Sequence, residues 1–401
     1  MKVRFTKLLT ILLIIVAATS SLGITVTKQV KNYETEENQE VVKEEEIKET
    51  YCLGKVIKII LDTEEELPGG NRQRSQELLL KIISGADKGK KRVTTNVIPD
   101  NPAFEIVGEL NKKYLITKVE NIKTGNEEYF IVDYYREPFL WYLSALFLIT
   151  LLVIGGFKGV RTIISLFVTI LLIAFMLIPF IEKGTNPLFA AVVVSFFATS
   201  FTMLLVAGAN AKSLASTLGT VIGVLLSGII ATLVIKYAPL SGLATSEAMI
   251  LWGNQFYKIN FKGLLATGMI VSCLGAVMDV AISISSAIQE IKIANPGYSM
   301  NKLFTSGMNV GKDIMGTMTN TLVLAYTGMA LPLLLLISHE KNPAKFLNLE
   351  LVASEVTAAI AGSIGLIISI PATALIMSWL VSRCHSIVNS SKSSGGKKGD
   401  F

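Results

Sequence analysis

The chain has 401 residues, of which 51% are hydrophobic, and its mean hydropathy is +0.54. These values exclude an ordinary soluble globular domain and indicate a polytopic membrane protein. The formal net charge of +6 requires no nucleic-acid partner, because much of it lies in short loops and a basic tail, where membrane topology explains it. The three cysteines and two histidines lack the spacing of a disulfide, a metal knuckle or a histidine-rich site, so no cofactor is expected and no metal is identified.

The first 50 residues predict a membrane-targeting segment followed by a charged linker. Lys2, Arg4 and Lys7 precede an apolar run at 8–18, and residues 19–23 are small or polar. This pattern is typical of a secretory signal or signal anchor with a cytosolic N-terminus, which we assign to residues 1–26; whether it is cleaved stays open. Residues 27–50 are rich in Glu and Lys and predict an acidic, solvated stalk.

Residues 51–137 predict a small β-rich domain on the extracytoplasmic side. Strand-like runs lie at 51–61, 76–84, 91–98, 113–120 and 128–135, with turns expected at 85–89 and 124–126. Five strands in so short a segment are typical of a closed barrel of the OB type or of a small sandwich. No face combines aromatic with basic side chains, which again indicates no nucleic-acid binding.

Seven further apolar segments predict a helical membrane domain at residues 138–382. They lie at about 139–157, 160–181, 187–208, 213–235, 263–288, 312–337 and 351–381, and each is long enough to span a bilayer. With the N-terminal segment they make about eight hydrophobic segments in a mainly α polytopic bundle. The distribution of Lys and Arg moderately favours cytosolic termini in the cell membrane, with a basic cytosolic tail at 383–401.

The segment at 213–235 has a small residue at every fourth position. These residues are Ala215, Gly219, Gly223, Ser227 and Ala231. A ridge of small side chains lets two helices approach closely. We therefore expect this helix to serve packing in a compact bundle.

Two windows place polar and ionisable groups within apolar segments. In residues 275–290, Asp279, Ser283, Ser286 and Glu290 fall at i, i+4, i+7 and i+11, which lines one face of a helix. The same offsets recur in residues 309–321, at Asn309, Asp313, Gly316 and Asn320. An ionisable group at membrane depth costs several kcal/mol and marks a candidate site. The two faces predict a polar seam inside a helical bundle.

Counting helical rise from outer ends near residues 262 and 338 places Asp279 beside Asn320 and Ser286 beside Asp313. Asp279 stays within the apolar region, whereas Asp313 and Glu355 are expected at the membrane interfaces. Together with the hydroxyls of Ser283, Ser286 and Thr317, these carboxylate and amide oxygens suit a proton or a hard cation. The alternative is interhelical hydrogen bonding without transport.

The connection between the two windows predicts a helix start. Asn295-Pro296-Gly297 breaks the chain, and Ser299 is a candidate cap for a long helix that follows. Gly307 and Gly311 are positions where this helix could bend or pack tightly.

Three stretches resemble the YibE/F-like family of bacterial membrane proteins. They are residues 275–290 (GAVMDVAISISSAIQE), 307–328 (GMNVGKDIMGTMTNTLVLAYTG) and 129–136 (YFIVDYYR). The resemblance implies an N-terminal hydrophobic segment, an extracytoplasmic β module and a multi-helix core, and it transfers no catalytic residues. An intramembrane Asp on a polar face is also similar to the proton-using helices of Sec accessory and resistance-nodulation-division transporters. This chain departs from that pattern in its helix number and by having Ser286 where an acidic residue would follow.

The favoured function is a membrane permease or ion-coupled transporter for a small ion or solute, with Asp279, Ser283, Ser286, Asp313, Thr317 and Asn320 along its path. The alternative is a non-transporting sensor or assembly factor that acts through the β module. Partners are the lipid bilayer and a homo-oligomer or second membrane protein. No enzyme is expected, because no nucleophile–base pair, metal signature or phosphate loop is present, and the estimated levels of Asp279 and Asp313 differ by about 12 Å.

Overall fold

The computed structural model describes residues 47–66, 72–101, 105–121, 125–253, 259–339, 345 and 348–394. The predicted signal segment at 1–26 and nearly all of the predicted stalk lie outside these residues. The described residues divide into two compact units, one within residues 47–150 and the other within residues 151–394.

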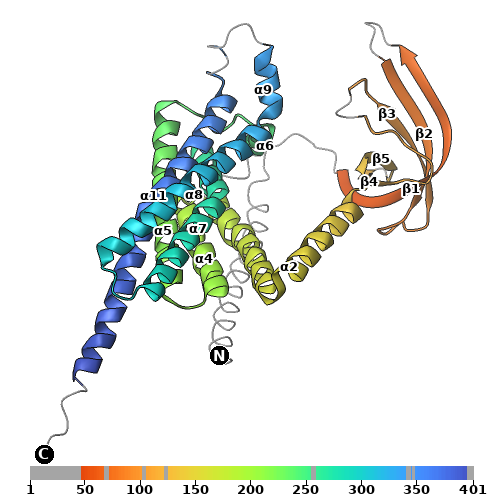
Figure 1. Ribbon diagram of the computed structural model, residues 1–401. Coiled ribbons are helices and arrows are strands. Elements are labelled where there is room, and N and C mark those ends of the chain that lie inside the picture. Colours follow the sequence, from red (N-terminus) through yellow and green to blue (C-terminus); the bar gives the residue numbers. More distant parts are fainter. Residues whose placement is uncertain are drawn as a thin grey trace, which may run out of the picture. The chain divides into compact units, whose positions relative to one another are not determined.

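The first unit contains a curved antiparallel sheet of five strands in the order β3-β2-β1-β4-β5 (Figure 1). The strands are β1 (Ile47–Glu66), β2 (Arg72–Ile82), β3 (Lys91–Ile98), β4 (Lys113–Asn121) and β5 (Glu127–Tyr134). Long β1 pairs with both β2 and β4, and shifts in its register with β2 increase its bend. The hydroxyl of Thr94 on β3 donates to the carbonyl oxygen of Tyr129 on β5, so the two edges approach and the sheet forms a half-barrel.

The boundaries of β3, β4 and β5 follow the sequence pattern to within one residue, whereas β1 and β2 each begin four residues earlier than predicted. Strand β1 begins at Ile47, inside the segment predicted to be a stalk. The charged residues there are strand residues, because they pair across the ladder with β4, as Lys48 does with Glu120. The core of the half-barrel contains Val56, Leu78, Leu80, Tyr114 and Ile116.

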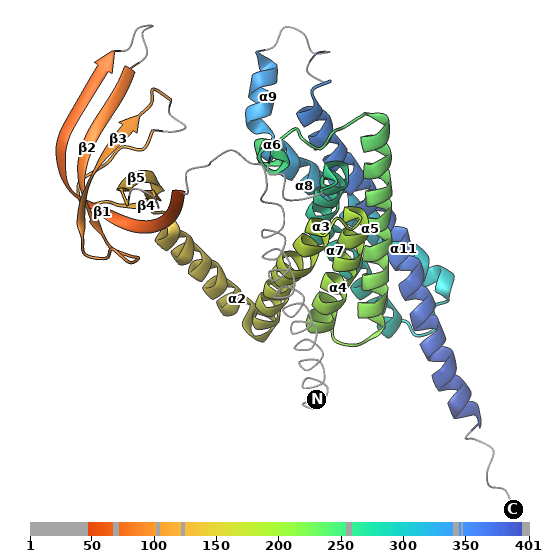
Figure 2. The same ribbon diagram turned by 180° about the vertical axis from the view of Figure 1, so that it is seen from behind.

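The second unit is helical (Figure 2). Its elements, the first of which starts in the other unit, are α2 (Glu137–Leu172), the π-helical turn η1 (Ile173–Leu177), α3 (Ile178–Glu182), α4 (Pro187–Ala207), α5 (Ala211–Tyr237), α6 (Ser246–Gly253), α7 (Phe261–Ala294), α8 (Met300–Met329), α9 (Leu331–Ser338) and α11 (Glu350–Ser394). In both views α5, α7, α8 and α11 lie side by side.

Among the described residues, five helices are long and apolar enough to cross a membrane, or six if the bent pair α8–α9 forms one span. The prediction of about eight hydrophobic segments is not confirmed. Two of the predicted segments belong to one 46-residue run, Glu137–Glu182, interrupted where Gly156 leaves helical geometry (φ 51°, ψ −130°). The bundle core joins α5, α7 and α11 through residues such as Val224, Val277 and Leu366.

Candidate functional site

The polar residues of the first window lie on one exposed face of α7. The helix begins after Asn260, whose side chain accepts a hydrogen bond from the amide of Gly263 at 3.1 Å. Asp279 and Ser283 are exposed on the surface of the single chain, and Ser286 is half-buried. The opposite face of α7 packs in the bundle core through Val277, Val280, Ile284 and Ile288. The predicted seam is therefore not inside the bundle of one chain, which corrects that expectation.

The second window lies on the exposed face of α8. Ser299 caps this helix by accepting from the amide of Lys302 at 3.5 Å. The exposed positions are Asn309, Lys312, Asp313, Gly316, Thr317 and Asn320. Gly307 and Gly311 are buried on the other side, where an added Cβ at Gly307 would lie 2.5 Å from Cδ1 of Ile288. Close packing of these glycines turns the polar side of α8 outward.

Packing contacts fix how α7 and α8 align. Gly307 lies against Ile288, Gly311 lies near Ile284, and Cys273 and Leu322 meet at a common neighbour, Gly362. Extended along both helices, this antiparallel register puts Asp279 level with Gly316. Asp279 is then three residues from the level of Asp313 and four from that of Asn320.

The predicted pairing of Asp279 with Asn320 and of Ser286 with Asp313 is therefore wrong by one helical turn. The prediction counted along one straight helix to Ser338, but α8 ends at Met329 and α9 leaves it at 68°. Because α9 is bent away from the axis of α8, its residues should not have been counted at full helical rise along that axis.

The corrected register also sets the level of Asp313 along the bundle. Ser216 lies five residues, or about 8 Å, inside the start of α5. It donates to the carbonyl oxygen of Ala281 and to the hydroxyl of Ser285, at 3.2 and 3.0 Å. Asp313, level with residue 282 of α7, therefore lies about 8 Å along the bundle from the start of α5, a level that agrees with the interfacial position expected for it.

Asp279 and Asp313 are separated by about 4.5 Å along the helix axes, less than the predicted 12 Å. The two side chains nevertheless point in different directions. Tyr326 of α8 shares a hydrogen bond with Ser272 of α7, which marks the edge of α8 that faces α7. Lys312, which is 14 residues before Tyr326, lies near the same edge of α8. Asp313 is rotated from Lys312 by about 100° about the helix axis, in the direction away from α7. This geometry gives no support to a proton shared by the two carboxylates.

Several charged side chains on the exposed faces of α7 and α8 have no partner among the residues that the structure describes. Within the described ranges, the side chains of Asp279, Lys312 and Asp313 take part in no hydrogen bond or ion pair. The hydroxyls of Ser286 and Thr317 donate to carbonyl oxygens of their own helices, at 2.6 and 3.0 Å, so their lone pairs remain available as acceptors. The exposed surfaces of α7 and α8 therefore carry unpaired charges and acceptor oxygens.

The small residues of α5 face the interior. Ala215, Gly219, Gly223, Ser227 and Ala231 are all buried. A Cβ at Gly223 would lie 2.7 Å from the carbonyl oxygen of Gly365 on α11, so the two backbones touch. The small side chains permit this approach.

Three features escaped the sequence interpretation. Lys312 adjoins Asp313 in the printed sequence but was not included in the path. The pair Ser272–Tyr326 depends on the tertiary register and has no local signal. Glu355, expected at an interface, lines a cavity of about 240 Å³ beside Tyr326. Within the described residues no group of three or more His, Cys, Asp or Glu could hold a metal ion.

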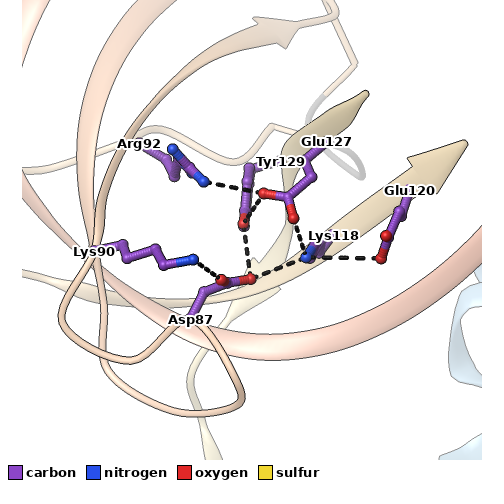
Figure 3. A network of polar contacts seen from close by, with 7 residues as sticks. All are labelled: Asp87, Lys90, Arg92, Lys118, Glu120, Glu127 and Tyr129. Carbon is purple, nitrogen blue, oxygen red and sulfur yellow. Dashed lines mark hydrogen bonds and ion pairs between the residues drawn. The ribbon is translucent and has the colours of Figure 1, made fainter. Parts of the chain in front are cut away.

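The β-rich unit holds a separate charged network (Figure 3). Asp87 is buried, and its carboxylate accepts from Lys90 at 2.6 Å and from Lys118 and the Tyr129 hydroxyl at 3.0 Å each. These donors hold the pKa of Asp87 well below its usual range. Glu127 and Asp87 together raise the pKa of Lys118. The network ties the 85–89 turn to β4 and β5.

Comparison with known proteins identifies the helical part of the chain. The profile described as "YibE/F-like protein" matches residues 143–383, which is more than half of the 401 residues and runs from α2 through most of α11. No curated protein and no solved structure matched the chain. The match contains both polar windows and leaves out the β-rich unit. The chain belongs to the YibE/F-like family.

Proposed function

We propose that this protein is a membrane permease or ion-coupled transporter in which Asp279 binds a proton or a cation. The observation that carries the proposal is an unpaired carboxylate in the middle of a long apolar helix, level with a second polar helix face. A charge left against lipid costs several kcal/mol, and such residues characteristically mark ion or proton pathways. The remaining path residues are Ser283, Ser286, Asp313, Thr317 and Asn320.

The exposed path requires a cover, and a second copy of the chain fits its charges. Lys312 and Asp313 are adjacent on α8 and are both exposed. A twofold axis along the membrane normal places the same residue of both copies at the same depth. Because Lys312 and Asp313 lie at nearly the same depth, Lys312 of one copy would then meet Asp313 of the other. The homo-oligomer would close the path between two polar faces, leaving Asp279 free to exchange its ligand.

Charge movement after a pH jump tests the proton site. Full-length protein in proteoliposomes on a solid-supported membrane is expected to give a transient current that Asp279→Asn abolishes. Glu247→Gln, which neutralises an exposed carboxylate on the short helix α6, is the matched control and should keep the current. An unchanged current in Asp279→Asn, inserted at normal levels, would reject Asp279 as the site.

A sensor or assembly factor is the second candidate, and the separate compact β-rich unit favours it. Its strand order and near contact of β3 with β5 support an OB-type barrel, which we place outside the cytoplasm with the C-terminal tail inside. We propose no enzymatic activity. Deletion of residues 51–136 should remove activity if this candidate is right, whereas Asp279→Asn should not.

A further inference from the structure

A cavity that is open on one side lies where α8 bends into α9, against the first turns of α11. Its volume is about 240 Å³, and Leu334, Val356 and Ile360 contribute to its apolar lining. The 68° bend carries α9 away from the direction of α8 and leaves this space beside α11. The polar side chains that line it are Tyr326, Thr327 and Glu355.

Two of these three polar groups already have partners. The Thr327 hydroxyl donates to the carbonyl oxygen of Val323 at 2.8 Å. The Tyr326 hydroxyl is engaged with Ser272 of α7, so this residue offers the cavity its aromatic ring. Glu355 is half-buried, and its carboxylate has no hydrogen bond or ion pair within the described part of the chain. Among the described residues that line the cavity, none is a lysine or an arginine.

The lining selects the chemistry of a ligand. A carboxylate against an apolar wall is costly unless it takes up a proton or a cation neutralises it. A hard metal ion would have to keep most of its six or more oxygen ligands as water, and the apolar lining offers that water few hydrogen-bond partners. An organic ammonium ion satisfies the charge, buries its carbon atoms against the wall and can approach the ring of Tyr326. The volume is below the roughly 300–1,000 Å³ of sites for drug-sized ligands, so the ligand is small.

We propose that this cavity binds a small hydrophobic ammonium cation, with Glu355 as its counter-ion. The site lies on α8, α9 and α11, apart from the α7 stripe that contains Asp279. It does not depend on the transport proposal, and either can fail alone.

Equilibrium dialysis of labelled benzyltrimethylammonium tests the site, with the full-length protein in phosphatidylcholine nanodiscs. Neutral lipid avoids attraction of the cation to the bilayer, and protein-free nanodiscs correct for partitioning. Neopentylbenzene has the same shape without the charge and serves as the matched ligand. Glu355→Gln removes the charge and keeps the shape of the site. Ala359→Phe fills the cavity and keeps the charge, because Ala359 is also part of the lining.

Saturable binding of the cation, and not of neopentylbenzene, is expected for the wild type. Glu355→Gln should weaken it at least ~30-fold, the equivalent of about 2 kcal/mol for a lost desolvated charge pair. Ala359→Phe should weaken it as well, whereas Asp279→Asn should bind like the wild type. Absence of saturable binding by the wild type, or retention of binding by folded Glu355→Gln, would overturn the proposal.

Discussion

Replacing Gly223 with alanine should destabilise the helical unit, whereas the same change at Gly268 should not. A Cβ at Gly223 would lie 2.7 Å from the Gly365 carbonyl oxygen and 2.8 Å from Cβ of Ser369. Carbon atoms pack best at about 3.5–4.0 Å, so α5 and α11 would have to separate by about 1 Å. Overpacking of this kind costs about 1–3 kcal/mol, of which the better helix propensity of alanine offsets ~0.5–1 kcal/mol. At Gly268 nothing lies within 4 Å of the added methyl group.

Cys273 provides the assay, because it is free and its side chain is buried. With Cys52 and Cys384 replaced by serine, a thiol-reactive dye reports the thermal unfolding of the bundle through Cys273 alone. Gly223→Ala is expected to lower the midpoint by about 2–8 °C, and Gly268→Ala to leave it unchanged or raise it. Equal midpoints for the two variants would refute the close approach of α5 and α11.

Three further outcomes are expected. Asp87→Asn should destabilise the β-rich unit by about 1–3 kcal/mol at neutral pH, measured by hydrogen exchange of the β4 and β5 peptides. Because folding depresses the pKa of Asp87, the ionised carboxylate stabilises the folded state fully above about pH 4, and this stabilisation is lost as the pH falls toward the folded pKa. The stabilities of wild type and variant should therefore converge at acid pH. A difference that stays constant at acid pH would contradict this reasoning. Glu350→Gln should lower the bundle midpoint, because the Glu350 carboxylate accepts from the backbone amide of Ser241 at 2.6 Å, and no change would show that this bond is dispensable. Asn320→Cys should form disulfide-linked dimers in oxidised membranes while Leu225→Cys, an exposed apolar position on α5, should not; equal cross-linking would count against pairing through the polar face.

Local signals in the sequence are strong where the structure depends on near neighbours. The alternation in β3 and the turn glycines Gly85 and Gly89, both with positive φ, predicted this part of the sheet closely. Ser299 was recognised as a helix cap because capping involves only the first turn. The start of β1 was missed because its charged residues pair in the ladder with a strand distant in the chain, as Lys48 does with Glu120.

Tertiary arrangement explains the remaining differences. Helical periodicity correctly groups Asp279 with Ser283 on one face, but it does not say which helices pack against the other faces. The levels of α7 and α8 were misaligned because Pro332 marks a bend whose angle the sequence does not give. The cavity at Glu355 depends on that same bend, so no pattern around Glu355 alone could have found it.

Water access at position 279 distinguishes a transport path from a dry structural face. Single-cysteine variants Asp279→Cys and Ile222→Cys, in a background without other cysteines, would be treated in membranes with a charged, water-soluble thiol reagent. The two positions lie at nearly the same depth, since Gly223 of α5 meets Val277 of α7, and Ile222 is an exposed apolar residue. A water-lined path predicts labelling at 279 and none at 222. A folded Asp279→Cys variant that resists the reagent from both sides of the membrane would contradict transport through this face.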